Sequence, residues 1–197
     1  MKVIDLSIHF MEGSEIAINR QPNPPAYCGH ECHAWDLHIK SHTGTYFETS
    51  SHVFRDGKNT SDVPIRDLVL SGYCMRVHND DKCITAEHFE KHLGNIAPDA
   101  AVLIDIGNDH TKHFSRDAAQ WMAARKIKLM GSNTQHYDTG FVNPTGFFVD
   151  LFTAQIPIVA GLTNLDQLPQ SEFQVIALPL KIENICTVPC RVIAITA

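Results

Sequence analysis

The chain has 197 residues, of which 44% are hydrophobic and 19% are charged, a balance typical of a globular protein rather than a disordered one. A chain of this length buries close to ~70% of its unfolded surface, so we expect one domain with a full core. The 16 Lys and Arg against 22 Asp and Glu give a net charge of −6. Because a phosphate backbone attracts clustered basic side chains, and no basic run is present, we expect no nucleic-acid partner.

The first ten residues, MKVIDLSIHF, lack a signal-type apolar stretch. No apolar run approaches the ~20 residues that span a bilayer. We therefore expect a cytoplasmic protein without a membrane partner. In that compartment its six cysteines are expected to be reduced thiols rather than a disulfide framework.

The first third of the chain predicts strands and a long arm. Residues 3–10 are rich in Val and Ile and predict a strand. Prolines in Gln21 to Pro25 predict a loop, and we take 11–33 as an N-terminal loop or arm of a single domain spanning 1–197. From Ala34 to Phe47 apolar and polar residues alternate, which predicts a strand or hairpin arm, although a solvated strand face gives the same pattern.

The remaining chain alternates short helices with strands. A short helix or turn is expected at 63–70, before a strand at 73–77. Thr85 and Ser115 are good N-caps and predict two further helices, the first running to about Leu93. The other expected strands are 100–106, 128–130, 156–159, 175–180 and 191–196. This order predicts an α/β fold with a mixed β-sheet.

Histidines are concentrated near the first expected arm, where residues 42–52 read HTGTYFETSSH. This segment resembles the H-x-G-T-H-x-D-x-P-x-H signature of the cyclase and kynurenine formamidase family, which includes isatin hydrolases. The resemblance continues at 4–7 (IDLS), 57–69, 115–131, 156–169 and 175–184, and so covers nearly the whole chain.

The resemblance implies a fold and an activity. The family has the swivelling β/β/α architecture, in which a mixed sheet curls around a small barrel with helices packed outside. Its members hydrolyse an amide, lactam, lactone or formamide bond of a small-molecule substrate. The resemblance also implies a homo-oligomer, a dimer or a tetramer, with pockets near the subunit interface.

The resemblance further implies a metal site. In the family, both histidines and the Asp at the start of the signature bind a divalent ion, zinc or manganese, and the last His is an acid–base catalyst. This chain keeps His42 and His52, but has Tyr46 in place of the second His and Glu48 in place of the Asp. We expect one ion at most, bound by His42, Glu48 and His52, with His52, Tyr46 and Glu48 as catalytic groups.

The later family ligands are missing. Phe148 and Ala160 stand where the family has a second-site His and Glu, and Asn133 replaces a family Asp. Two alternatives therefore stay open. One is a metal-free acid–base enzyme, in which His52 is the base and Tyr46 donates a hydrogen bond to an oxyanion. The other is a non-catalytic binding protein that kept the fold and the pocket.

Two further groups of residues are candidates for chemistry. Cys28, His30, Cys32 and His33 offer four zinc-compatible ligands within six residues, although so compact a cluster is also compatible with free surface residues. His136 and Asp138 follow Asn133 and are candidates to supply a substitute polar group in the pocket.

Overall fold

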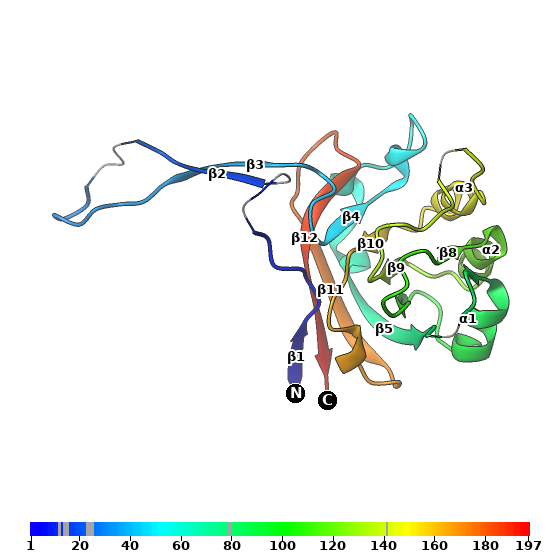
Figure 1. Ribbon diagram of the computed structural model, residues 1–197. Helices are drawn as coiled ribbons and strands as arrows, with labels where there is room; N and C mark the ends of the chain where they lie inside the picture. Colours follow the sequence, from blue (N-terminus) through cyan, green and yellow to red (C-terminus); the bar gives the residue numbers. More distant parts are fainter. Residues whose placement is uncertain (12, 14–15, 23–25, 79, 141) are drawn as a thin grey trace.

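The computed structural model describes residues 1–11, 13, 16–22, 26–78, 80–140 and 142–197. Its main sheet has eight strands in the order β1-β12-β11-β5-β7-β9-β10-β4. Because β4 also pairs with β12, the last seven close into a barrel and β1 lies along its outside (Figure 1). The predicted mixed sheet and small barrel are confirmed. The strands are Lys2–Asp5 (β1), Tyr46–Glu48 (β4), Val69–Arg76 (β5), Ala101–Asp105 (β7), Leu129–Ser132 (β9), Ile158–Ala160 (β10), Phe173–Pro179 (β11) and Thr187–Thr196 (β12).

Helices cover one side of this barrel. The neighbouring strands β5, β7, β9 and β10 are parallel, and parallel neighbours need a crossover connection. The three crossovers carry α1 (Ala86–Leu93), α2 (Arg116–Ala124) and α3 (Phe147–Thr153), which lie together outside the barrel in Figure 1. A small parallel pair, β6 (Cys83–Ile84) with β8 (His113–Phe114), joins the starts of α1 and α2.

Side-chain alternation builds two cores. Every barrel strand contributes to an inner cluster that includes Phe47, Leu103 and Val192. The alternate residues of β4, β5, β7, β9 and β10 face the helices and form the second cluster. Along β4, Phe47 belongs to the inner cluster and Tyr46 to the outer one. Glu48, two residues after Tyr46, is therefore on the helix side of the barrel.

The helix starts follow local sequence signals. Thr85 and Ser115 precede α1 and α2 in extended conformation, as predicted. His88 Nδ1 accepts the backbone N–H of Thr85 at 3.2 Å, so this histidine helps to cap α1. The third helix, α3, was not predicted, because it is only seven residues long and its N-cap residue is Gly146. Gly146 has a φ of +84° and no side chain that could cap the helix.

Two expected strands are shorter than the sequence pattern indicates. The expected strand 3–10 ends at Asp5, and Ser7 makes only an isolated bridge to Leu162. The expected continuous strand from Ala34 is broken: β3 (Trp35–Ile39) pairs with β2 (Ile16–Arg20), and β4 starts separately in the barrel. The turn at Gly44, with φ of +61°, separates them.

The β2–β3 hairpin projects away from the barrel (Figure 1). Trp35 and Leu37, which share the apolar face of the alternating segment, are 52% and 57% exposed, because β3 pairs only with β2 among the described strands. The proline loop predicted at 21–25 falls partly on residues 23–25, outside the described residues. Among the helices of the described chain, none has both the length and the apolar character needed to cross a membrane.

Several other boundaries differ by a few residues. The turn expected at 63–70 is a 3-10 helix over Ile65–Leu68, and β5 begins directly after it. The last strand, expected from residue 191, begins at Thr187 because its first residues pair with β4.

Candidate metal and catalytic site

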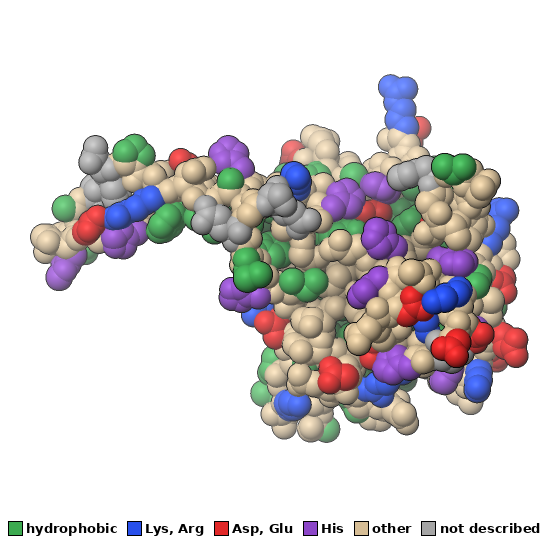
Figure 2. Space-filling view, viewed as in Figure 1, with side chains coloured by type: hydrophobic (Ala, Val, Ile, Leu, Met, Phe, Trp, Pro, Cys, Tyr) green, Lys and Arg blue, Asp and Glu red, His purple; other side chains and the backbone are tan. Residues whose placement is uncertain are grey.

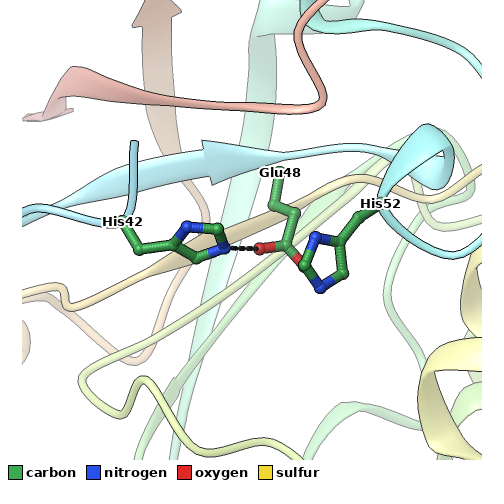
Figure 3. A group of neighbouring side chains, drawn as sticks. All are labelled: His42, Glu48 and His52. Atoms are coloured by element: carbon green, nitrogen blue, oxygen red, sulfur yellow. Dashed lines mark hydrogen bonds and ion pairs between the residues drawn. The ribbon is translucent and has the colours of Figure 1, made fainter. Parts of the chain in front are cut away.

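Three polar side chains meet where β4 leaves the barrel. Glu48 is the last residue of β4 and lies across from Ile158 of β10 and Thr187 of β12. His52 follows in a 3-10 turn over Ser50–His52, and His42 comes from the loop before β4. The two imidazoles approach the carboxylate from either side (Figure 3).

The loop that carries His42 is fixed by small residues and a threonine. A Cβ on Gly44 would clash with the Phe10 ring, and one on Gly161 would clash with the Gly44 carbonyl. The buried Thr45 hydroxyl donates to Gly161 O at 2.6 Å and accepts the N–H of Ile8 at 2.8 Å. This packing explains the G-T pair of the motif, because it holds His42 at a fixed distance from β4.

The carboxylate is buried between two half-exposed imidazoles. Glu48 Oε2 lies 3.1 Å from His42 Nε2, and Oε1 lies 3.8 Å from His52 Nε2. The side chain of Glu48 is 4% exposed, against 46% for His42 and 33% for His52. The other ring nitrogen of His42 contacts the Ser41 hydroxyl at 2.9 Å, which leaves Nε2 directed at the carboxylate.

Burial changes the protonation of all three groups. It raises the pKa of Glu48 to about 7, although a hydrogen bond from Thr187 opposes the shift. Burial also lowers the pKa of His42. The pKa of His52 is lowered by burial first and by the charge of the nearby His42 second. At neutral pH the imidazoles are therefore mainly neutral and the carboxyl group exchanges a proton readily.

These residues fit a divalent metal ion. One ligand atom from each of His42, Glu48 and His52 lies within 4.8 Å of the other two, and this is the one such group of three among the described residues. No Lys or Arg in the described chain forms an ion pair with the buried carboxylate, so a cation would compensate its charge. Two imidazoles and a carboxylate with an open fourth position are a common donor set of catalytic zinc.

Tyr46 lies beside this group. Its ring centroid is 5.0 Å from that of His42, and its side chain lines the adjoining cavity. Burial, together with the charge of Glu48, raises the pKa of Tyr46. The phenol is thus protonated at neutral pH, which makes it a poor metal ligand but a competent hydrogen-bond donor.

A cavity of about 450 Å³ opens next to the three ligands. Part of its wall is apolar and comes from Val53, Phe148, Val149 and Ile158. Phe148 is held by ring contacts with Tyr137, Phe147 and Phe152, at centroid distances of 6.0, 5.8 and 5.6 Å. The cavity has the size and apolar character of a small-molecule site.

The position of each remaining candidate is as follows. His136 and Asp138 line the cavity. His38, a nearby histidine that could have completed a one-ion site with His42, lies on the projecting strand β3, away from the three ligands. Cys28, His30, Cys32 and His33 are also on the projecting hairpin, and they are not brought within common ligand distance among the described residues.

Two neighbours of the site come from the far end of the chain. Thr187 Oγ1 lies 3.4 Å from Glu48 Oε2, and Cys186 Sγ lies 3.9 Å from His52 Nδ1. Cys186 is half-buried and directly precedes β12. No local pattern could have found either contact, because both depend on the pairing of β4 with β12.

Comparisons with known proteins point to one family. The Cyclase family model matches residues 4–139. Kynurenine formamidase of Salinibacter ruber (strain DSM 13855 / M31) is 25% identical over 174 residues, covering 80% of this chain and 77% of that protein.

Two solved structures share the fold. Isatin hydrolase A from Labrenzia aggregata, bound to benzyl benzoate, has a TM-score of 0.82 at 23% identity and covers 99% of this chain and 93% of its own. A predicted metal-dependent hydrolase from Bacillus stearothermophilus has a TM-score of 0.78 at 21% identity, covering 98% of this chain and 97% of its own.

Proposed function

The chain belongs to the cyclase family, and we propose that it is a hydrolase that cleaves an amide, lactam, lactone or formamide bond of a small molecule with one metal ion at most. The observation that carries this proposal is the convergence of His42, Glu48 and His52 beside an apolar cavity. Zinc and manganese are the ions proposed. A zinc ion bound there would polarise the scissile carbonyl and lower the pKa of a bound water.

Each residue has a role that its surroundings support. His42, Glu48 and His52 would hold the ion. The half-exposed His52 faces both the carboxylate and the cavity. We propose that, when its imidazole is not bound to the ion, it moves the proton between water and leaving group. Tyr46, protonated and in the cavity wall, would donate a hydrogen bond to the developing oxyanion.

The cavity supports a substrate with an apolar part. Its volume of about 450 Å³ suits a molecule of one or two rings. The related isatin hydrolase A from Labrenzia aggregata was solved bound to benzyl benzoate, an ester with two aromatic rings.

A metal-free enzyme is the second candidate, favoured by the pKa of about 7 for Glu48. A carboxyl group with that pKa, between two imidazoles, can take and return protons at neutral pH without a metal. The apolar Phe148 and Ala160 at family ligand positions favour a third candidate, a non-catalytic binding protein.

The test uses full-length protein purified without added histidines. Metal content is measured per chain, and hydrolysis is assayed on a panel of aryl amides, lactams, lactones and formamides, before and after chelation and reloading with zinc or manganese. His42→Ala and His52→Ala are assayed beside His110→Ala, whose exposed side chain lines a different cavity.

The outcomes separate the candidates. About one equivalent of metal, with turnover lost in His42→Ala but kept in His110→Ala, supports the metal hydrolase. Turnover that survives chelation yet disappears in His52→Ala supports metal-free catalysis. Ligand binding without any turnover supports the non-catalytic binding protein.

We also propose a homo-oligomer, a dimer or a tetramer. The support is the projecting β2–β3 hairpin, on which Trp35 and Leu37 are exposed, and apolar side chains are visible along it in Figure 2. Light scattering should report more than one chain per particle, and a Trp35→Glu, Leu37→Glu variant should shift that mass toward one chain.

A cytoplasmic location is proposed from the six free cysteines, because thiols stay reduced in that compartment. Imaging of the tagged chain tests this proposal.

A further inference from the structure

One acidic side chain in the cavity is fixed in place without using all its hydrogen-bonding capacity. Asp138 Oδ1 accepts the N–H of Thr139 at 2.7 Å, the N–H of Thr145 at 2.6 Å and the Thr139 hydroxyl at 3.3 Å. Within the described part of the chain, no hydrogen bond or ion pair uses Oδ2. The loop therefore fixes the carboxylate through Oδ1 and leaves Oδ2 without a described partner, in a residue that lines the cavity.

The same lining contains no permanent positive charge. Among its described residues there is no Lys or Arg, while Glu48 and Asp138 are acidic. Arg116 approaches one lining residue, Gly146, whose added Cβ would contact the Arg116 side chain. Arg116 is already committed to both oxygens of Asp150, at 2.8 and 3.0 Å, so its charge is compensated there.

Apolar contact and charge together restrict the ligand. The wall made by Phe148, Val149 and Ile158 favours a hydrocarbon ring. A carboxylate on that ring would enter a lining that offers acidic groups and no Lys or Arg, and burying a charge without a partner is costly. An ammonium or N–H group would instead find a charged acceptor at Asp138.

We infer that this cavity selects aryl or cyclic molecules that carry an N–H donor or an ammonium group, and rejects carboxylates, with Asp138 as the residue that sets the selection. The inference rests on the proposed function only in taking the cavity as the substrate site. It names a property of binding, which does not require a metal ion or turnover.

The test is a probe series that differs only in charge. Binding of benzylamine, benzamide and benzoate is measured by ligand-observed NMR on the full-length protein, both as purified and after chelation. The chelated sample is decisive, because a carboxylate can bind a metal ion directly. We expect benzoate to bind at least about tenfold more weakly than benzylamine, which is the size of one charge-assisted hydrogen bond.

The matched variants are Asp138→Asn and Asp80→Asn. The asparagine at 138 keeps an oxygen that can accept the loop N–H groups and removes the charge. It should weaken benzylamine binding about tenfold and change benzamide binding little. Asp80 is exposed and lines another cavity, so its variant should bind all three probes like the unaltered chain.

Three results would overturn the inference. These are benzoate binding as tightly as benzylamine, benzylamine affinity unchanged in a folded Asp138→Asn, or no binding of any ring probe. The charge preference of the unaltered chain is decisive even where the variant does not fold. A chain that shows the amine preference without hydrolysing any substrate would contradict the proposed hydrolase and leave this inference intact.

Discussion

One wall of the cavity is made by His42, Glu48 and His52, which come from a loop, a strand end and a turn and are joined by polar contacts. Another is made by Phe148 and Ile158, which belong to α3 and β10 and are held by apolar packing. Ala160, directly across from Tyr46 in the β10–β4 pairing, belongs to the same buried apolar cluster. The polar groups that would bind the ion and the apolar groups that stabilise the cavity thus lie largely on different elements. A substitution in one set should therefore leave the contribution of the other set intact.

The largest expected effect is on metal binding by the polar wall. His42→Ala should lower zinc affinity by more than about a hundredfold, because even the loss of an outer-sphere partner costs 10–100-fold. His42 is half-exposed, so the melting temperature should change little. Competition with a chromophoric chelator measures the affinity, with His110→Ala as control. Unchanged zinc affinity in His42→Ala would place the ion elsewhere.

The apolar wall should respond in the opposite way. Phe148→Ala removes a ring that contacts three others and should lower the free energy of unfolding by about 2–3 kcal/mol, somewhat less than for a fully buried ring. Zinc affinity should stay the same. Urea denaturation measures the stability, and Val142→Ala, a 90% exposed apolar side chain, is the control. A matching fall in zinc affinity would show that the two walls are coupled.

A smaller effect is expected on the stability of the metal-free protein. The pKa of Glu48 is raised from 4.5 to about 7 in the folded chain, so Glu48 binds more protons in the folded state than in the unfolded state between these values. The contribution of Glu48 to stability therefore falls as pH rises from about 4.5 to 7 and stays reduced above 7. Glu48→Gln should stabilise the chelated protein by about 1–2 kcal/mol at pH 8 and much less at pH 5. Thermal melts at both pH values check this, and an equal gain at pH 5 would contradict it.

The smallest expected effect is the change in zinc affinity when the pH changes by one unit. Zinc must displace the proton from Glu48, whereas His42 and His52, with lowered pKa values, are already neutral near pH 7. Affinity should therefore rise about tenfold per pH unit up to pH 7 and level off above it. Titrations in buffers from pH 5.5 to 8.5 measure this. A flat profile would show that Glu48 does not ligate the ion.

The part of the site that could be predicted is the part encoded locally. His42, Glu48 and His52 lie within eleven residues, and the Gly44–Thr45 turn places them on one side of β4. The helices α1 and α2 were predictable for the same reason, because Thr85 and Ser115 give their starts directly.

What could not be predicted depends on contacts between distant segments. The alternation of apolar and polar residues continues past Ile39 and indicates one continuous strand. In the structure the chain turns at Gly44, and only β4 joins the barrel. Thr187 reaches Glu48 through strand pairing alone. The selectivity assigned to Asp138 depends on how its loop folds back to Thr145, which no spacing in the sequence indicates.

The seam between β4 and β12 has a kinetic consequence. Glu48 and Thr187 are 139 positions apart, so this contact closes one of the longest loops in the chain. Contacts of such separation are expected to form late in folding, after most of the polypeptide has left the ribosome. Interactions absent from the folding transition state act on the unfolding rate. A metal ion bound at this seam should then slow the unfolding of the closed barrel and leave its folding rate nearly unchanged.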